Sequence, residues 1–219
     1  MKALRIIALC PLFFIALVGC SDAKRGSTVD FDLLQQELRE GDLLFRRGVG
    51  VLGHVVAATD SDGQFSHVGI AVKIDDSWHV VHAVPAERDF EGDIDRVKCE
   101  PIESFFDQMR AGNGAVYRVS LAPEQIEVAI NNALRLSAEQ RPFDHDYNLD
   151  DTTELYCTEL VEYVFGQGGV SISEGRRTHV NFPSMTGDYR AHVARIDMRA
   201  VGFDQKQQTK PYLFILKPK

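Results

Sequence analysis

The 219-residue sequence has no excess of positive charge, no internal repeat, no low-complexity tract and no second domain boundary. Its 24 lysine and arginine residues are outnumbered by 32 aspartate and glutamate residues. An acidic chain is poorly suited to bind the phosphate backbone of nucleic acids or an anionic membrane surface through charge. We therefore expect no nucleic-acid partner and one domain with a sizeable core.

Cysteine is also scarce. Only four are present, and Cys10 and Cys20 belong to the apolar N-terminal segment, which leaves Cys99 and Cys157 for the folded part. In an oxidising compartment these two cysteines could form one disulfide at most. Cys157 therefore has three interpretations at this stage: a disulfide partner of Cys99, a buried core residue, or a reactive thiol.

Residues 1–19 have the pattern of a secretory signal. Positively charged Lys2 and Arg5 precede an apolar run, Ile6–Val18, that is too short for a comfortable membrane span. The segment ends in Leu17-Val18-Gly19-Cys20, which resembles the bacterial lipobox. That resemblance implies cleavage before the cysteine and lipidation of its sulfur.

The expected organisation is a signal peptide at 1–19, a lipidated tether at 20–29 and one domain at 30–219. Cleavage removes two positive charges and no acidic residue, so the net charge falls from −8 to −10. The lipid on Cys20, rather than charge, would then hold the protein at the membrane. Ser21 follows the lipidation site, and by the sorting convention of such lipoproteins it favours the outer over the inner membrane. The predicted location is the periplasmic side of a bacterial cell envelope.

The remaining residues alternate between strand-like and helix-like patterns. The pattern predicts strands at 43–45, 67–74, 79–84, 97–102, 115–120 and 212–216, and helices at 31–39, 49–58, 103–110, 123–138 and 155–165, the first of them capped by Asp30. Strands cluster early and helices surround them, which predicts an α+β fold.

The stretch 155–165 reads as a short helix with Cys157 in its first turn. Leu160, Val161, Val164 and Phe165 recur at the spacing of one buried face. A helix start offers unpaired backbone N–H groups and a partial positive charge, which favour a thiolate and can stabilise an oxyanion. The sequence therefore offers Cys157 as a candidate nucleophile.

In the strand at 67–74, alternate valine and isoleucine side chains form one apolar face, and His67, Gly69 and Ala71 lie on the other. The two small residues predict that another element approaches this second face closely. We expect that element to be the helix that carries Cys157.

His82 lies on the next strand. If residues 74–77 form the hairpin loop, His82 is opposite Gly69 and diagonal to His67, at roughly 7–8 Å between Cα atoms. A register shifted by one residue would separate the two imidazoles. His79 faces the opposite side from His82, which weakens a paired-ligand metal site.

Three segments carry a resemblance to a known family. Phe65-Ser-His-Val-Gly-Ile-Ala-Val72, Val80-Val-His-Ala-Val-Pro85 and Tyr156-Cys-Thr-Glu-Leu-Val161 resemble the YiiX/YebB-like branch of the NlpC-type cysteine hydrolases. Gly41-Asp-Leu-Leu-Phe-Arg46 and Phe143-Asp144 are similar as well, so the resemblance covers about 41–165. It implies a circularly permuted papain-like fold, an antiparallel sheet packed against helices, related to the lecithin retinol acyltransferase-like proteins.

The resemblance implies that Cys157 is the nucleophile, that His67 is the general base and then acid, and that His82 is the third, orienting residue. Members of this branch often have glutamate at the third position, whereas the acyltransferase-like relatives have histidine. Tyr156 is expected to help shape an oxyanion site beside the Cys157 backbone N–H. Exposed carboxylates just ahead of the cysteine would raise its pKa (Asp150, Asp151 and Glu154).

The predicted function is a lipid-anchored thiol hydrolase that cleaves a peptide or peptidoglycan-derived amide, with no cofactor and no metal. Three alternatives stay open: a lipid-directed thiol hydrolase or acyltransferase, an inactive binding module, and a weaker metal site built from His67, His82 and Cys157. Thiolate and imidazole suit zinc, but no ligand-spacing motif is present.

Overall fold

The computed structural model describes residues 29–50, 53, 54, 56 and 65–173, together with the backbone of three short strand segments at 178–179, 197–198 and 211–212. The predicted signal segment, Cys20 and most of the predicted helix at 49–58 lie outside the described residues. No helix in the described part of the chain is both long enough and apolar enough to span a membrane.

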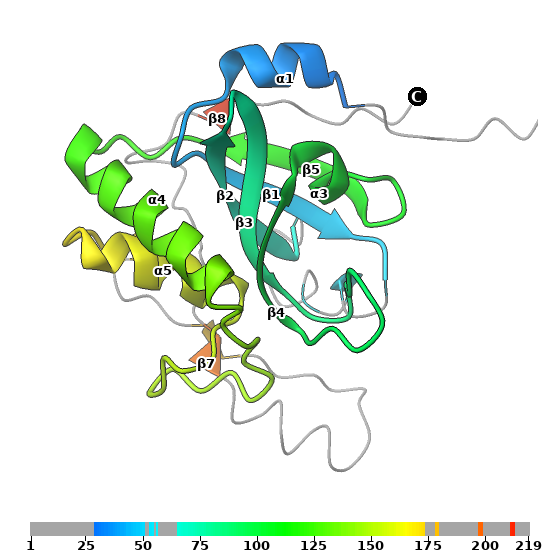
Figure 1. Ribbon diagram of the computed structural model, residues 1–219, viewed down its shortest axis with the longest axis vertical. Coiled ribbons are helices and arrows are strands. Elements are labelled where there is room, and N and C mark those ends of the chain that lie inside the picture. Colours follow the sequence, from blue (N-terminus) through cyan, green and yellow to red (C-terminus); the bar gives the residue numbers. More distant parts are fainter. Residues whose placement is uncertain are drawn as a thin grey trace, which may run out of the picture.

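An antiparallel sheet forms the centre of the domain (Figure 1). Its six strands run in the order β4-β3-β2-β1-β5-β8, and each neighbouring pair is antiparallel. The strands are β1 (Leu43–Gly48), β2 (His67–Ile74), β3 (Ser77–Val84), β4 (Arg96–Pro101), β5 (Ala111–Tyr117) and β8 (Pro211–Tyr212). A separate pair joins β6 (Thr178–His179) to β7 (Asp197–Met198).

Helices cover both faces of this sheet, so the fold is α+β as the sequence predicts. They are α1 (Phe31–Glu37), α3 (Ile102–Phe105), α4 (Pro123–Ala138) and α5 (Cys157–Gln167). In Figure 1, α4 and α5 lie side by side to the left of the strands, with α3 to the right and α1 above. Asp30 accepts a hydrogen bond from the N–H of Leu33 and so caps α1, which is the role its position predicts.

The two faces of β2 bury different partners. Val68, Ile70 and Val72 belong to the core that contains the buried side chains of α4 and α5. Ala71, on the other face, belongs to a second core with side chains of α1 and α3. The expectation that the helix of Cys157 approaches the His67 face is therefore wrong. That helix packs against the face of β2 that carries the valine and isoleucine side chains, and the face with the small residues packs against α1 and α3.

The β2–β3 hairpin has the register that brings the histidines together. Ile74 pairs with Ser77 and Ile70 with Val81, so of the two registers that the sequence leaves open, the hairpin has the one that places His82 opposite Gly69. The two turn residues, Asp75 and Asp76, have φ of 47° and 64°. Positive φ at both central residues matches the right-handed twist of the strands, and aspartate tolerates it well.

The predicted helix at 103–110 is wrong in length, because α3 stops after Phe105. The backbone carbonyl of Asp107 accepts the N–H groups of both Arg110 and Ala111, which turns the chain back into β5. Burial of Phe105 and Phe106 against the sheet requires this early turn.

Gly69 is expected to be required by close packing within the hairpin. A Cβ at this position would lie 2.4 Å from Val80 Cγ1 and 3.1 Å from His82 Cβ. We predict that Gly69→Ala lowers the free energy of unfolding by about 1–3 kcal/mol, because β2 and β3 cannot move apart to admit the methyl group without breaking the backbone hydrogen bonds between them. Chemical denaturation would measure this.

Gly112→Ala is the matched control for this change. Gly112 lies in β5, and a Cβ there would meet nothing closer than Val49 Cγ1 at 3.6 Å. Its effect should be near zero or slightly stabilising, because alanine restricts the unfolded chain. Equal effects of the two substitutions would contradict the packing explanation.

Candidate active site

Cys157 is the first residue of α5, at the end of the helix that meets the start of β2. Tyr156 is the N-cap and supplies no side-chain hydrogen bond to the helix. The thiol instead contacts backbone N–H groups of Cys157 itself, Thr158 and Val68. Val68 directly follows His67 in the chain, so the sulfur and the His67 backbone lie at the same end of β2. The residue as a whole is half-buried.

Cys157 and Cys99 are both free cysteines, so they do not form the disulfide considered from the sequence. Cys99 lies on β4 opposite Val81, and burial raises its pKa to about 11. Among the two thiols, only that of Cys157 lies at a helix start.

Burial also raises the pKa of Cys157 to about 11, although its backbone hydrogen bonds and the charge of Arg46 act in the opposite direction. Desolvation is thus the leading cause, rather than the carboxylates of Asp150, Asp151 and Glu154, whose side chains are exposed. The thiol is protonated at neutral pH in this resting state. The helix start favours a thiolate, as the sequence indicates, but in the resting state burial has the larger effect on the pKa of Cys157.

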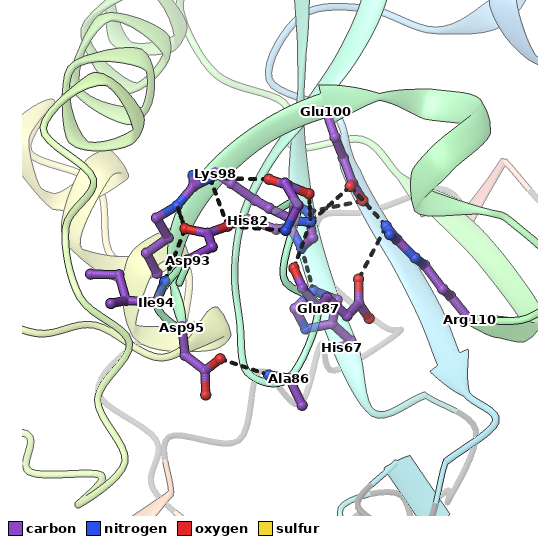
Figure 2. Close-up of polar contacts among 12 residues, drawn as sticks. His67, His82, Ala86, Glu87, Asp93, Ile94, Asp95, Lys98, Glu100 and Arg110 are labelled. Atoms are coloured by element: carbon purple, nitrogen blue, oxygen red, sulfur yellow. Dashed lines mark hydrogen bonds and ion pairs between the residues drawn. The ribbon is translucent and has the colours of Figure 1, made fainter. Parts of the chain in front are cut away.

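His67 and His82 contact each other directly across the hairpin. His67 Nε2 lies 2.8 Å from His82 Nδ1, and the two rings meet edge to face (Figure 2). His67 is half-buried at the start of β2, whereas His82 is completely buried. The register of the β2–β3 hairpin thus brings the two imidazoles into direct contact.

Glu100 continues this chain of contacts on β4. Its Oε1 lies 3.1 Å from His82 Nε2, although the approach is not ideally aligned for a hydrogen bond. Its Oε2 accepts a 2.8 Å hydrogen bond from Arg110 and lies 3.1 Å from Lys98 Nζ. Figure 2 shows Glu100 between His82 and Arg110. One oxygen thus faces an imidazole and the other faces two cations.

Opposing effects act on the pKa of Glu100. Burial raises the pKa, but the contact with His82 and the positive charge and hydrogen bond of Lys98 outweigh it and hold the pKa of Glu100 well below the ordinary value. The carboxyl group is therefore ionised at neutral pH.

Phe105 forms the apolar wall of the site. Its ring lies 5.7 Å from that of His67 and 5.2 Å from that of His82. The guanidinium of Arg46 stacks on this ring at 4.6 Å and donates a 2.8 Å hydrogen bond to the Phe105 carbonyl. Arg46 also pairs with Glu87, and it lies opposite His67 in the sheet. With these residues around the pair, His82 is completely buried and His67 is half-buried.

Both imidazoles are neutral at neutral pH. Burial lowers the pKa of His67 well below its ordinary value, and the positive charges of Arg46 and Lys98 lower it further. Burial also lowers the pKa of His82, and this effect exceeds the opposing contribution of Glu100. The resting site therefore combines a neutral thiol with neutral imidazoles, which suits general-base rather than ion-pair chemistry.

The loop between β3 and β4 is fastened over this site. Lys98 donates hydrogen bonds to the Glu87 carbonyl at 3.0 Å and to Asp89 at 2.9 Å. Asp93 accepts from Arg96 at 2.9 Å, and its pKa falls to about 2 because of that bond and a backbone hydrogen bond from Asp89. These contacts fix the conformation of the loop and so position Glu87 to form its ion pair with Arg46.

We predict that the folded protein loses stability as the pH falls below about 6.5. The pKa values of His67 and His82 are lower in the folded than in the unfolded state, so between these values only the unfolded chain takes up protons. The contribution of these two histidines to the free energy of unfolding is fully present above their pKa in the unfolded chain. As the pH falls below that pKa, the contribution decreases by up to about 1.4 kcal/mol per pH unit for each histidine.

Urea unfolding at pH values from about 7.5 to 5 measures this slope. A folded His67→Gln variant should keep only the contribution of His82. A free energy of unfolding that does not change between about pH 6.5 and 5 would contradict the buried neutral state of the pair.

Several residues of the site were not anticipated from the sequence. Arg46, Glu87, Lys98, Glu100 and Arg110 surround the histidines. One signal was present: Lys98 and Glu100 alternate with apolar residues in a strand, and Lys98 pairs with His82 across the sheet. Tyr156 is buried with its ring 5.1 Å from that of Tyr147, and its oxyanion role stays a prediction.

No protein-family model matches the sequence, and no curated protein matches it. Among solved structures, the chain is similar to the crystal structure of the metalloprotein YiiX from Escherichia coli O157:H7, with a TM-score of 0.52 and 21% sequence identity. The match covers 78% of this chain and 87% of that chain. The fold is YiiX-like. At this identity the likeness shows the fold alone, so the permuted papain-like assignment stays an expectation.

The description of that neighbour as a metalloprotein raises the question whether these residues fit a metal ion. Within the described residues, no group of three or more His, Cys, Asp or Glu side chains is arranged to hold one. His67 Nε2 and His82 Nδ1 face each other, and His82 Nε2 faces Glu100. These nitrogens are directed at protein partners rather than at a common point, so the site does not fit a resident metal.

Proposed function

We propose that this protein is a cysteine hydrolase that cleaves an amide bond through an acyl-enzyme intermediate. The observation that carries the proposal is the contact between His67 and His82, formed at the same end of β2 that meets the thiol-bearing start of α5. A nucleophile, a base and a group that orients the base are the parts that such catalysis needs.

In the proposed reaction, His67 takes the proton of the Cys157 thiol as the sulfur attacks the substrate carbonyl carbon. The backbone N–H groups of Cys157 and Thr158 are candidates to stabilise the oxyanion at the helix start. His67 then returns the proton to the leaving amine, which departs and leaves a thioester. Water attacks this thioester with His67 as the base, and the thiol is released with its proton.

The proposed substrate is a peptide or peptidoglycan-derived peptide of the cell envelope, because the N-terminal segment predicts export and lipidation at Cys20. The proposed anchor is tested by metabolic labelling with a palmitate analogue followed by membrane fractionation. Label and membrane association should both disappear in Cys20→Ser. An unlabelled wild-type protein would overturn the anchor and leave the hydrolase proposal intact.

The acyl-enzyme is tested by direct trapping. Wild-type protein is mixed with a panel of peptides and peptidoglycan fragments, quenched in acid, and digested for site-resolved mass spectrometry. An acyl mass on Cys157, absent from Cys99 and released with time, is the expected result. Turnover without any acyl mass on Cys157 would overturn the mechanism.

A second candidate is a lipid-directed thiol hydrolase or acyltransferase, favoured by histidine at the third position. The same trapping experiment with phospholipid vesicles decides between them. A fatty acyl mass on Cys157 from phospholipid, with no acylation by any peptide, would establish the second candidate in place of the first.

A further inference from the structure

We propose that Glu100 is a positioning residue that acts through His82 to decide which nitrogen of His67 carries the proton. The inference rests on the proposed function, since it concerns the base that Cys157 would use. Glu100 on β4, His82 on β3 and His67 on β2 lie on three neighbouring strands, and Glu100 would set the direction in which protons are shared along them.

The first step is that Glu100 can only accept a hydrogen bond from His82. The side chain is 7% exposed, and its Oε2 is taken by Arg110 at 2.8 Å and Lys98 at 3.1 Å. These two cations keep the carboxyl group ionised, and an ionised carboxylate has acceptors and no donor. Glu100 Oε1, which faces His82 Nε2 at 3.1 Å, therefore requires a proton on that nitrogen.

The second step follows from the chemistry of neutral imidazole. A neutral ring carries one proton, so a proton on His82 Nε2 leaves His82 Nδ1 as an acceptor. His67 Nε2 lies 2.8 Å from that acceptor and must therefore be the donor. His67 is left with an unprotonated Nδ1, which is the nitrogen available to receive a proton from Cys157.

No other described carboxylate is placed to set this direction. Glu87 pairs with Arg46 and lies 3.3 Å from Arg110, in the same cluster of charges, but its contacts are with guanidinium groups rather than with an imidazole. Glu87 therefore provides a matched control. It has the same charge and one of the same partners as Glu100, without the contact to His82.

Glu100→Gln makes the sharpest test. The carboxamide keeps the shape of the side chain, but it has one acceptor oxygen and one donor nitrogen. Arg110 and Lys98 require the oxygen, so the amide nitrogen turns toward His82 Nε2 and donates to it. His82 must then carry its proton on Nδ1 and donate to His67 Nε2, and His67 is left with its proton on Nδ1. His67 Nδ1 is then already protonated and cannot accept the proton of the Cys157 thiol.

The direct measurement is nitrogen NMR of the histidine rings in full-length protein labelled with ¹⁵N-histidine, without substrate. Wild-type protein and Glu87→Gln should both show His67 and His82 protonated on Nε2. Glu100→Gln should show both rings protonated on Nδ1. Assignment uses His67→Gln and His82→Gln spectra.

Activity provides a second measurement where a substrate is found. We expect Glu100→Gln to lower kcat by about 10²- to 10⁴-fold with a smaller change in KM, since a wrong tautomer costs about 10⁴-fold in a serine-protease triad. Glu87→Gln should lower kcat less than Glu100→Gln does, since it leaves the histidine tautomers unchanged.

The spectra separate this inference from the proposed function. A wild-type His67 protonated on Nδ1 overturns the role of Glu100, and so does a folded Glu100→Gln protein with unchanged tautomers. If Glu100→Gln does not fold, the wild-type spectrum still tests the inference through the nitrogen of His67 that carries the proton. If the spectra are as expected but no substrate tested acylates Cys157, the proposed hydrolase is overturned and the positioning role of Glu100 is upheld.

Discussion

Replacing Cys157 with alanine is expected to lower kcat by about 10⁴-fold or more on any substrate that the wild-type protein hydrolyses. Removal of a nucleophile abolishes the acyl-enzyme route and leaves only the contribution of binding and of the oxyanion site. The fold should persist, because the thiol is half-buried at a helix start and its loss leaves the α5 core residues in place. Steady-state hydrolysis and thermal unfolding measure the two effects.

Cys99→Ala is the control for this variant. Cys99 is also a free, half-buried cysteine whose pKa is raised by burial, but it lies on β4 rather than at a helix start. Its activity should equal that of the wild type. Full activity in Cys157→Ala would overturn the proposed nucleophile, whereas equal losses in both variants would indicate a structural effect of cysteine removal.

Replacing Arg46 with alanine is expected to lower the free energy of unfolding by about 3 kcal/mol or more, because removal of one partner leaves the other buried groups of a charge cluster without compensation. The side chain is 2% exposed, stacks on Phe105 and pairs with Glu87. For a domain of this size that loss corresponds to a fall in Tm of about 6–12 °C.

Arg88→Ala is the matched control for Arg46. Arg88 carries the same charge, but its side chain is 63% exposed and its nearest ion-pair contact, with Asp95, is at 3.9 Å. Its effect should stay within about 0.5 kcal/mol, as is usual for surface substitutions. An Arg46→Ala variant as stable as Arg88→Ala would show that the buried cluster contributes little to the fold.

The bounds of two regular elements followed from local patterns, whereas the strand predicted at 115–120 begins and ends earlier, as β5 (Ala111–Tyr117). The strand at 67–74 and the helix at 123–138 have the predicted ends in the structure. In the first, β-branched residues alternate with small ones, and in the second a proline opens a regular apolar stripe. The predicted helix at 103–110 failed because the burial of two phenylalanines, a tertiary effect, ends it after one turn.

Packing decided which face of β2 received the helix of Cys157. Both faces of that strand can be buried, since one carries large apolar side chains and the other small ones. The sequence assigned α5 to the side of His67, whereas it packs against Val68 and Ile70. Gly69 is small because Val80 and His82 lie against it, which only the folded hairpin reveals.

The sequence by itself identified the candidate site residues, placed Cys157 in the first turn of a helix, and limited the hairpin to two registers, one of which aligns His67 with His82. These depend on short-range periodicity and on a two-residue turn. Only the tertiary structure decided that Glu100 faces His82 and that burial raises the pKa of the thiol and lowers those of the imidazoles. Desolvation and ion pairing depend on residues that are distant in the chain, so no local pattern carries them.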